Sequence, residues 1–258
     1  IRRIFRKGFV KKMLRTKAPS TYGFRTLLYG TLLPAPLIVQ TEPGVFIRAV
    51  EEGHDCGIHC WDHVKWQDLL PRLTEEQIRE DFRKSMDLFE RYASRKAKSC
   101  AAPGWQVTPE SLAVQDELGF DYCSDIRGSG YAFRPRMGGR TFKTLQIPTT
   151  LPTLDEVYGR EDIPGDRIVD FYLDQIQPGL NVHTIHAEME GRAQGPILEQ
   201  LLDRCAERGV TFRTLYDVAF DISVRKPLVH VCDVVAGELP GRSGTVAVQK
   251  CAREEGTE

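Results

Sequence analysis

The chain has 258 residues, of which 41% are hydrophobic, and a net charge of −1. This length and composition exclude a disordered protein and favour an α/β domain with appendages, because the chain can bury a substantial core. No run reaches the roughly 20 apolar residues that a transmembrane helix needs, and no secretory signal is visible. Seven cysteines without a CxxC pair argue against a disulfide framework and a cysteine-cluster zinc site, and favour a reducing, cytosolic setting.

The charge is unevenly distributed, because residues 1–18 hold eight basic side chains and no acidic one. Apolar residues recur there near helical spacing, and this pattern is typical of a helix lying on an anionic membrane. Each basic residue contributes about 1 kcal/mol to such binding. An ordinary surface helix remains the alternative, whereas no nucleic acid is expected, because no recognisable nucleic-acid motif follows the segment. The residues predicted to bind the membrane are Arg2, Arg3, Phe5, Arg6, Phe9, Lys11, Lys12 and Met13.

A second apolar stretch, residues 22–39, is broken by Pro34 and Pro36 and is too short to cross a bilayer. We therefore assign residues 1–40 to a membrane-associating amphipathic and apolar helical segment. Beyond it, predicted strands and helices alternate. Strands are expected at residues 55–61, 97–105, around Tyr122, at 144–150 and at 181–188, and helices at 44–52, 73–95, 108–119, 166–176 and 195–209.

The two best-marked helices carry their own start signals. Thr74 and Gln77 have capping-box spacing ahead of an apolar stripe, and Thr108 with Pro109 has the pattern of an N-cap followed by a first helical residue. Alternating strands and helices predict a parallel sheet with helices outside it. In such folds, functional residues collect at the carboxyl ends of the strands. The polar clusters predicted at these ends are His59 and His63, Pro103 to Trp105, Asp125 with Arg127, and His186, Glu188 and Glu190.

The segment "GIHCWDH" places His59 and His63 four residues apart. On a helical turn, two imidazoles at this spacing project from one face and can converge on one cation. A histidine-rich surface turn is the alternative for this segment alone. His183 is expected to be structural, since strand alternation turns it away from its neighbours. The ordered series of clusters nevertheless favours a metal-dependent hydrolase over coincidence.

Several stretches resemble one family in order and spacing: "KMLRTKAPSTYGF", "GIHCWDHVKWQ", "AAPGW", "SDIRG", "QIPTTLPTLDEVYGR", "TIHAEMEG" and "GVTF". The chain resembles the NodB-type polysaccharide deacetylases and, more closely, the 4-deoxy-4-formamido-L-arabinose-phosphoundecaprenol deformylases of Gram-negative bacteria. This resemblance runs over nearly the entire chain. It implies an α/β fold, a NodB-type distorted (β/α) barrel at residues 41–220 that lacks its N-terminal part. Residues 221–258 are expected to form a small C-terminal β-hairpin appendage.

The resemblance also implies roles for the polar clusters. His59 and His63 would hold a divalent cation, which is Zn, Mn or Co because two imidazoles and a carboxylate suit each of them. His186 would protonate the leaving amine, and Asp125 would orient or tune the site by charge pairing, with Arg127 as its candidate partner. The substrate would be bound by Pro103, Gly104, Trp105, Arg127 and Glu188.

The implied reaction is deformylation of an undecaprenyl-phosphate-linked formamido sugar. Its product, a free amino sugar, would be used to modify lipid A during lipopolysaccharide biosynthesis, and polymyxin resistance is the expected biology. Because a polyisoprenyl-linked substrate stays in the bilayer, a peripheral enzyme on the cytoplasmic face of the bacterial inner membrane is expected. A further alternative is another NodB-type polysaccharide N-deacetylase.

The chain differs from the family in one respect. The family begins with a strand that bears an Asp-x-Asp signature. No Asp-x-Asp occurs in these 258 residues. A third metal ligand and the catalytic base are therefore expected on a strand upstream of Ile1. The alternatives to a fragment of a complete deformylase are a truncated product with little activity, and a non-catalytic, membrane-bound binder of the sugar-lipid.

Overall fold

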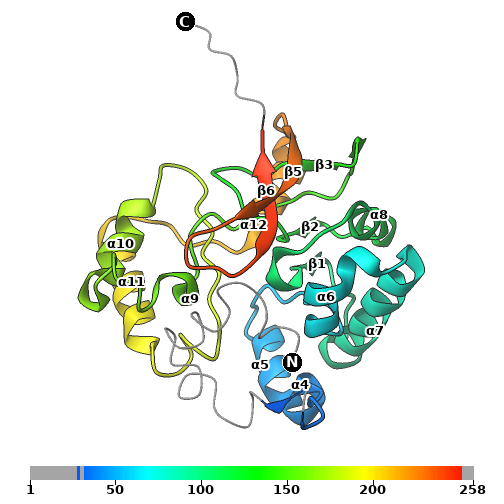
Figure 1. Ribbon diagram of the computed structural model, residues 1–258, viewed down its shortest axis with the longest axis horizontal. Helices are drawn as coiled ribbons and strands as arrows, with labels where there is room; N and C mark the ends of the chain where they lie inside the picture. The colour runs from blue at the N-terminus through cyan, green and yellow to red at the C-terminus, as the bar shows by residue number, and fades with distance from the viewer. Residues whose placement is uncertain (1–27, 30–31, 252–258) are drawn as a thin grey trace, which may run out of the picture. The chain divides into compact units, whose positions relative to one another are not determined.

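The computed structural model describes residues 28–29 and 32–251 (Figure 1). The residues predicted to bind the membrane, from Arg2 to Met13, lie outside this part of the chain, so their role stays a prediction. Within the described part, no helix has both the length and the apolar character that crossing a bilayer requires.

Contacts divide the described chain into two compact units. The His59 unit comprises residues 38–149, 213–237 and 246–251, and the His186 unit comprises residues 150–212 and 238–245 with the few described residues before 38. The expected segments 1–40, 41–220 and 221–258 were drawn from the sequence pattern, and their boundaries stay a prediction.

Helices make up much of the His59 unit, and their ends follow local sequence signals. In α7, the Thr74 and Gln77 side chains each bond the other residue's backbone N–H, as the capping-box spacing predicted. Thr108 and Ser111 form the same reciprocal pair at the start of α8. The two helices pack side by side (Figure 1). The unit contains α4 (Ile38–Thr41), α5 (Pro43–Glu51), α6 (His63–Leu69), the 3-10 turn Leu70–Arg72, α7 (Glu75–Ala93), α8 (Pro109–Leu118) and α12 (Leu215–Arg225).

Short parallel segments form the centre of the His59 unit. β1 (Ser99–Cys100) pairs in parallel with β2 (Tyr122–Cys123). Ile58 forms a single parallel bridge to Cys100, and Cys123 forms one to Gln146. Gly57 allows the first of these approaches, because a Cβ at this position would lie 2.4 Å from Ser99 Oγ. The predicted segments at 55–61 and 144–150 therefore join as bridges rather than as full strands, and the carboxyl ends of neighbouring segments meet at one edge.

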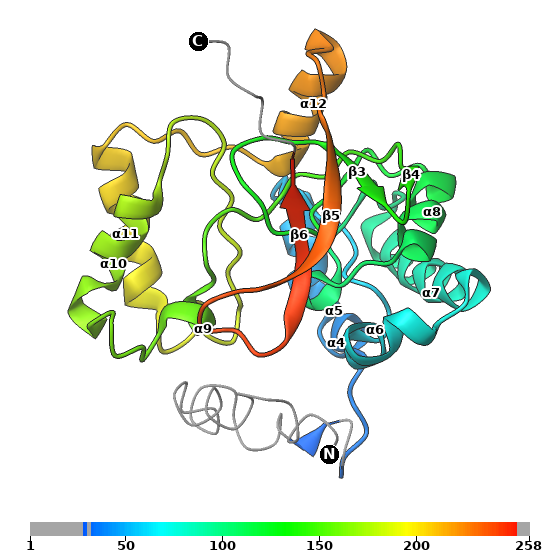
Figure 2. The same cartoon turned by 45° about the horizontal axis from the view of Figure 1, so that its top comes forward.

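A second sheet has the strand order β4-β3-β5-β6. Its strands are β3 (Arg134–Met137), β4 (Arg140–Thr141), β5 (Val231–Glu238) and β6 (Thr245–Lys250). β3 is antiparallel to β4 and parallel to β5, and Figure 2 shows β5 beside β6. The two C-terminal strands thus extend a sheet that begins at Arg134, because β5 pairs with β3.

A disulfide joins Cys232 of β5 to Cys251, which follows β6, across a Cα–Cα distance of 4.4 Å. The cysteine pattern argued against a disulfide framework and did not predict this single bridge. An odd cysteine count leaves room for one bridge, and residues 19 apart in sequence meet only once the strands pair. The remaining described cysteines, Cys56, Cys60, Cys100, Cys123 and Cys205, are free thiols.

The His186 unit has its own core, built where α9 (Leu154–Val157), α10 (Ile168–Gln175) and α11 (Gly195–Glu207) pack together. A 3-10 turn, Gly165–Arg167, precedes α10. The strand predicted at residues 181–188 does not form. Val182 is bonded to Thr150 and Leu151 instead, and residues from 187 onward turn, because Met189 and Glu190 donate their N–H groups back to the His186 carbonyl.

Candidate active site

His59 lies immediately after the bridge that Ile58 makes, at the carboxyl end of its segment. Its Nδ1 is 2.5 Å from the carbonyl oxygen of Ala101, the residue that follows β1. A carbonyl only accepts, so Nδ1 carries the hydrogen and Nε2 is left with its lone pair. A backbone carbonyl fixing the ring in this way is the usual arrangement behind a metal-ligating histidine.

His63 is the first residue of α6, and its ring centroid lies 5.2 Å from that of His59 with the planes tilted by 58°. The spacing had suggested that both histidines lie on one helical turn, but only His63 belongs to a helix. Cys60 between them has a φ of +60°, and Asp62 caps α6 by accepting the Lys65 N–H at 2.9 Å. The two imidazoles are therefore brought together by a left-handed turn that leads into a helix. Both side chains are exposed.

Two exposed imidazoles at this separation fit as part of a divalent cation site. The nearby carboxylates are used elsewhere. Asp62 caps its helix, Asp81 accepts the Trp61 N–H at 2.8 Å, and Asp55 accepts both the Tyr122 hydroxyl and the Tyr216 N–H. Among the residues that the structure describes, no group of three or more His, Cys, Asp or Glu side chains is arranged to hold a metal ion. The described residues thus supply two ligands and do not complete the site.

Asp125 follows β2 and is fully buried. Its Oδ1 accepts the N–H of Ala102 at 2.6 Å, and its Oδ2 accepts the side-chain amides of Gln115 at 2.8 Å and Gln146 at 3.1 Å. Burial raises the pKa of Asp125 from 3.8 to about 8, and these bonds oppose the rise only partly. The ion pair with Arg127 that the sequence analysis suggested does not form. Asp125 instead holds the backbone where the Pro103–Trp105 loop begins.

That loop, the 3-10 turn Pro103–Trp105, has an unusual backbone. Gly104 has a φ of +63° and Trp105 a φ of +52°, and the left-handed conformation costs a residue other than glycine roughly 1–2 kcal/mol. The indole is held in place, because its Nε1 donates to Thr149 Oγ1 at 3.1 Å and the Arg127 guanidinium lies 4.8 Å from its ring centroid. Arg127 and Trp105 are both buried. Their side chains are packed inside the protein and do not extend into solvent.

His186 lies in the other unit, directly before the turn that begins at residue 187. Its Nδ1 is 3.7 Å from Oδ1 of Asp155, and its side chain is 38% exposed while that of Asp155 is only 8% exposed. The Thr153 hydroxyl donates to the same carboxylate oxygen at 2.5 Å and so fixes it. An ordered carboxylate beside one ring nitrogen orients an imidazole for proton transfer at the other. Glu188 is exposed on the following turn.

Sequence reasoning did not single out Asp155, although it lies within the quoted stretch "QIPTTLPTLDEVYGR". The available signal was the spacing of Thr153 and Glu156, which form a capping box at the start of α9 and so place Asp155 in the first helical turn. Gln115 and Gln146 were also missed. Each looks like an ordinary amide in a mixed segment, and only the fold brings both to Asp125.

Comparison with known proteins shows which family the chain belongs to. The family model for polysaccharide deacetylase matches residues 30–123. A Shewanella sediminis protein named as 4-deoxy-4-formamido-L-arabinose-phosphoundecaprenol deformylase ArnD is 34% identical, over 96% of this chain and 79% of its own length. A Wigglesworthia glossinidia brevipalpis protein of the same name is 28% identical, over 96% of this chain and 86% of its own length.

Solved structures show the same fold. A structure named as a polysaccharide deacetylase of Mycobacterium smegmatis has a TM-score of 0.63 at 15% identity, covering 90% of this chain and 86% of that one. A structure named as a polysaccharide deacetylase of Pseudomonas aeruginosa PAO1 has a TM-score of 0.58 at 19% identity, covering 74% and 66%. The fold is therefore the α/β fold of the polysaccharide deacetylases. Within that class, the chain belongs to the family of 4-deoxy-4-formamido-L-arabinose-phosphoundecaprenol deformylases.

Proposed function

We propose that this protein hydrolyses the formamide of 4-deoxy-4-formamido-L-arabinose linked to undecaprenyl phosphate, releasing formate and leaving the free amino sugar. The observation that carries the proposal is the match to a relative of that name over 96% of the chain. The paired imidazoles of His59 and His63 at a strand end agree with it. We propose further that the core is part of a distorted (β/α) barrel, as the resemblance implies.

In this proposal, His59 and His63 hold a divalent cation, Zn, Mn or Co, together with a third ligand outside the described residues. When bound, the cation polarises the formyl carbonyl and lowers the pKa of a water molecule. The Ala101 carbonyl keeps His59 in the tautomer that leaves Nε2 for the ligand bond. Mutating either histidine is therefore expected to remove cation binding as well as activity.

His186 donates the proton that the amine needs in order to leave. Its Nδ1 faces Asp155, so Nε2 is the nitrogen that transfers the proton, and the carboxylate stabilises the charged ring before the transfer. The loop at Trp105, held by Thr149 and Arg127, forms the wall against which the sugar binds. Its rigidity lowers the entropic cost of orienting the substrate.

We also propose, as the sequence predicts, that the protein is peripheral on the cytoplasmic face of the inner membrane and that residues 1–40 contact anionic lipid. A lipid-linked substrate supports this, and so does the exposure of the described apolar residues in this region, 80% for Leu32 and 79% for Ile38. The amino-sugar product would then be available for lipid A modification and polymyxin resistance.

The test is formate release from the synthetic lipid-linked formamido sugar, with Mn²⁺, Zn²⁺ or Co²⁺ added. We expect turnover that a chelator abolishes and that is lost in His59→Ala and His186→Ala. His54→Ala is the control, because the ring of this exposed histidine pairs with the exposed Glu52. If the chain binds the lipid-linked sugar equally well in chelator and releases no formate, the sugar-lipid binder replaces the enzyme as the function.

A further inference from the structure

Glu190 holds the main chain of His186 from both sides. The His186 N–H donates to Glu190 Oε2 at 3.0 Å, and the Glu190 N–H donates to the His186 carbonyl at 3.0 Å. The Met189 N–H reaches the same carbonyl at 2.9 Å. Both polar backbone groups of His186 are therefore bonded within one turn, and the bond to its N–H comes from a side chain four residues along the chain.

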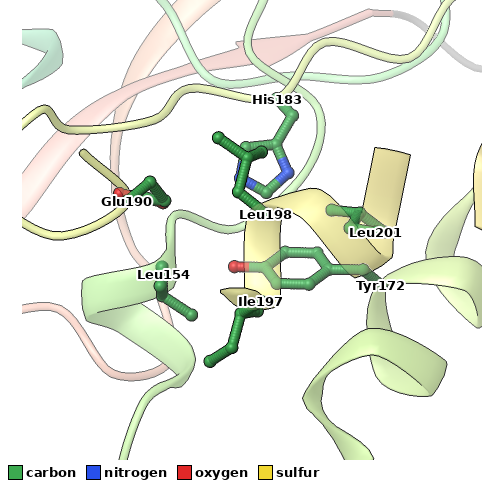
Figure 3. Close-up of a pocket in the computed structure, with 7 residues that line it drawn as sticks. All are labelled: Leu154, Tyr172, His183, Glu190, Ile197, Leu198 and Leu201. Carbon is green, nitrogen blue, oxygen red and sulfur yellow. The ribbon is translucent and has the colours of Figure 1, made fainter. Parts of the chain in front are cut away.

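This carboxyl group is unusually placed for a residue whose only task is to cap a turn. Glu190 is 5% exposed, and its second oxygen, Oε1, is buried without a hydrogen-bond partner in the described part of the chain. Glu190 lines a small pocket together with Leu154, Tyr172, His183, Ile197, Leu198 and Leu201 (Figure 3). Burial raises the pKa of Glu190. A half-satisfied buried carboxyl costs stability, and a turn of this kind does not require one.

The His186 ring has its own partner on a different element. Asp155 of α9 faces Nδ1, and the Thr153 hydroxyl fixes that carboxylate. Asp155 can orient the ring only if the His186 backbone stays where α9 can reach it. Asp155 thus sets the direction of the ring, while Glu190 sets the point from which the ring extends.

We propose that Glu190 is a positioning residue for His186, fixing the main chain so that the ring meets Asp155 and presents Nε2 to the leaving amine. The inference rests on the proposed deformylase function, in which His186 is the proton donor. Glu190 touches no reacting atom. Its carboxyl acts through the N–H of His186.

The variants are Glu190→Ala, which removes the acceptor, and Glu190→Gln, which keeps an oxygen in reach of the N–H. Glu199→Ala on α11 is the matched control, because Glu199 is an exposed glutamate in the same unit. Three quantities are measured: the exchange rate of the His186 amide hydrogen by NMR, the fraction of the Nδ1–H ring tautomer from ¹⁵N shifts, and kcat with KM for formate release.

In Glu190→Ala we expect amide exchange roughly 10- to 100-fold faster, as the loss of a hydrogen bond to a carboxylate implies. The Nδ1–H tautomer should decrease, and kcat should fall about 10- to 100-fold with KM unchanged, because binding does not use His186. In Glu190→Gln, the amide exchange rate, the tautomer fraction and kcat should stay close to those of the parent protein. Glu199→Ala should match the parent protein.

Unchanged amide exchange in Glu190→Ala would overturn the proposal, and so would faster exchange with an unchanged ring tautomer. If the parent chain releases no formate, the deformylase function fails for this chain. In that case the exchange rate and the tautomer still decide whether Glu190 positions His186. If the parent is active and kcat survives the alanine substitution, the proposal is wrong while the function stands.

Discussion

The ion pair between Arg242 and Glu156 offers the sharpest test of how the His186 unit is held together. Arg242 lies in the loop between β5 and β6, and its Nη1 is 3.3 Å from Glu156 Oε1 in α9. The arginine side chain is 10% exposed and the glutamate side chain 1%. Replacing Arg242 by Met keeps much of the side-chain volume and removes the charge, so Glu156 loses this ion pair.

Breaking a buried ion pair from one side costs about 3–5 kcal/mol, because the charge that stays buried loses a favourable interaction. The other oxygen of Glu156 still accepts the Thr153 N–H at 3.1 Å, which places the cost near the lower end, about 3 kcal/mol. For a chain of this size each kcal/mol lowers Tm by about 2–4 °C, so Arg242→Met should lower Tm by roughly 6–12 °C.

The assay is thermal unfolding of Arg242→Met beside Arg136→Met. Arg136 pairs with Asp233, but both side chains are 47% exposed, so its loss should cost less than about 1 kcal/mol. Adding Glu156→Gln to Arg242→Met removes the buried charge and should recover part of the lost stability. Equal Tm values for the two single variants, or no recovery in the double variant, would refute the reasoning.

Three other substitutions have defined outcomes. Because burial raises the pKa of Asp125 to about 8, the folded protein holds a proton between pH 4 and 8 that the unfolded chain has released. The free energy of unfolding should therefore fall as pH rises through this window, and urea titrations at pH 5 and pH 8 should show a smaller fall in Asp125→Asn; equal falls would contradict this. Gly241→Ala puts a Cβ 1.9 Å from the Glu156 carbonyl oxygen at a φ of +78°, so it should lower Tm more than Gly209→Ala, whose φ is +73° in open space. Equal Tm losses would mean that the loop at Gly241 accommodates the added Cβ without a further loss of stability. His59→Ala should abolish Mn²⁺ binding in calorimetry, whereas His54→Ala should leave it intact; unchanged binding in His59→Ala would remove this residue from the metal site.

Much of the helical structure could be predicted because its signals are local. The capping boxes at Thr74 and Thr108 and the apolar stripe of α7 lie within a few residues of the atoms that they bond. The same holds for the His59 and His63 pair, since a four-residue spacing keeps two side chains close whether the intervening turn is helical or, as here, left-handed. The family, too, was evident from motifs in the sequence.

The features that needed the fold join residues far apart in the chain. The sequence gives no sign that Cys232 will meet Cys251, because their meeting depends on how β5 and β6 pair. Residues 181–186 have the alternation of a strand, yet no strand forms there. Val182 instead accepts isolated backbone hydrogen bonds from Thr150 and Leu151.

At the candidate site, too, local sequence signals did not predict contacts between residues far apart in the chain. The sequence by itself predicted which side chains are candidates for the chemistry, because histidines in motifs such as "GIHCWDH" are recognisable by type and spacing. Only the tertiary structure decided what holds them: Asp155 for the His186 ring, Glu190 for its backbone, and Ala101 for His59. The physical reason is that a hydrogen bond requires two groups within about 3 Å and an ion pair requires them within about 4 Å. For groups on separate elements, that proximity is a property of packing and not of the local sequence.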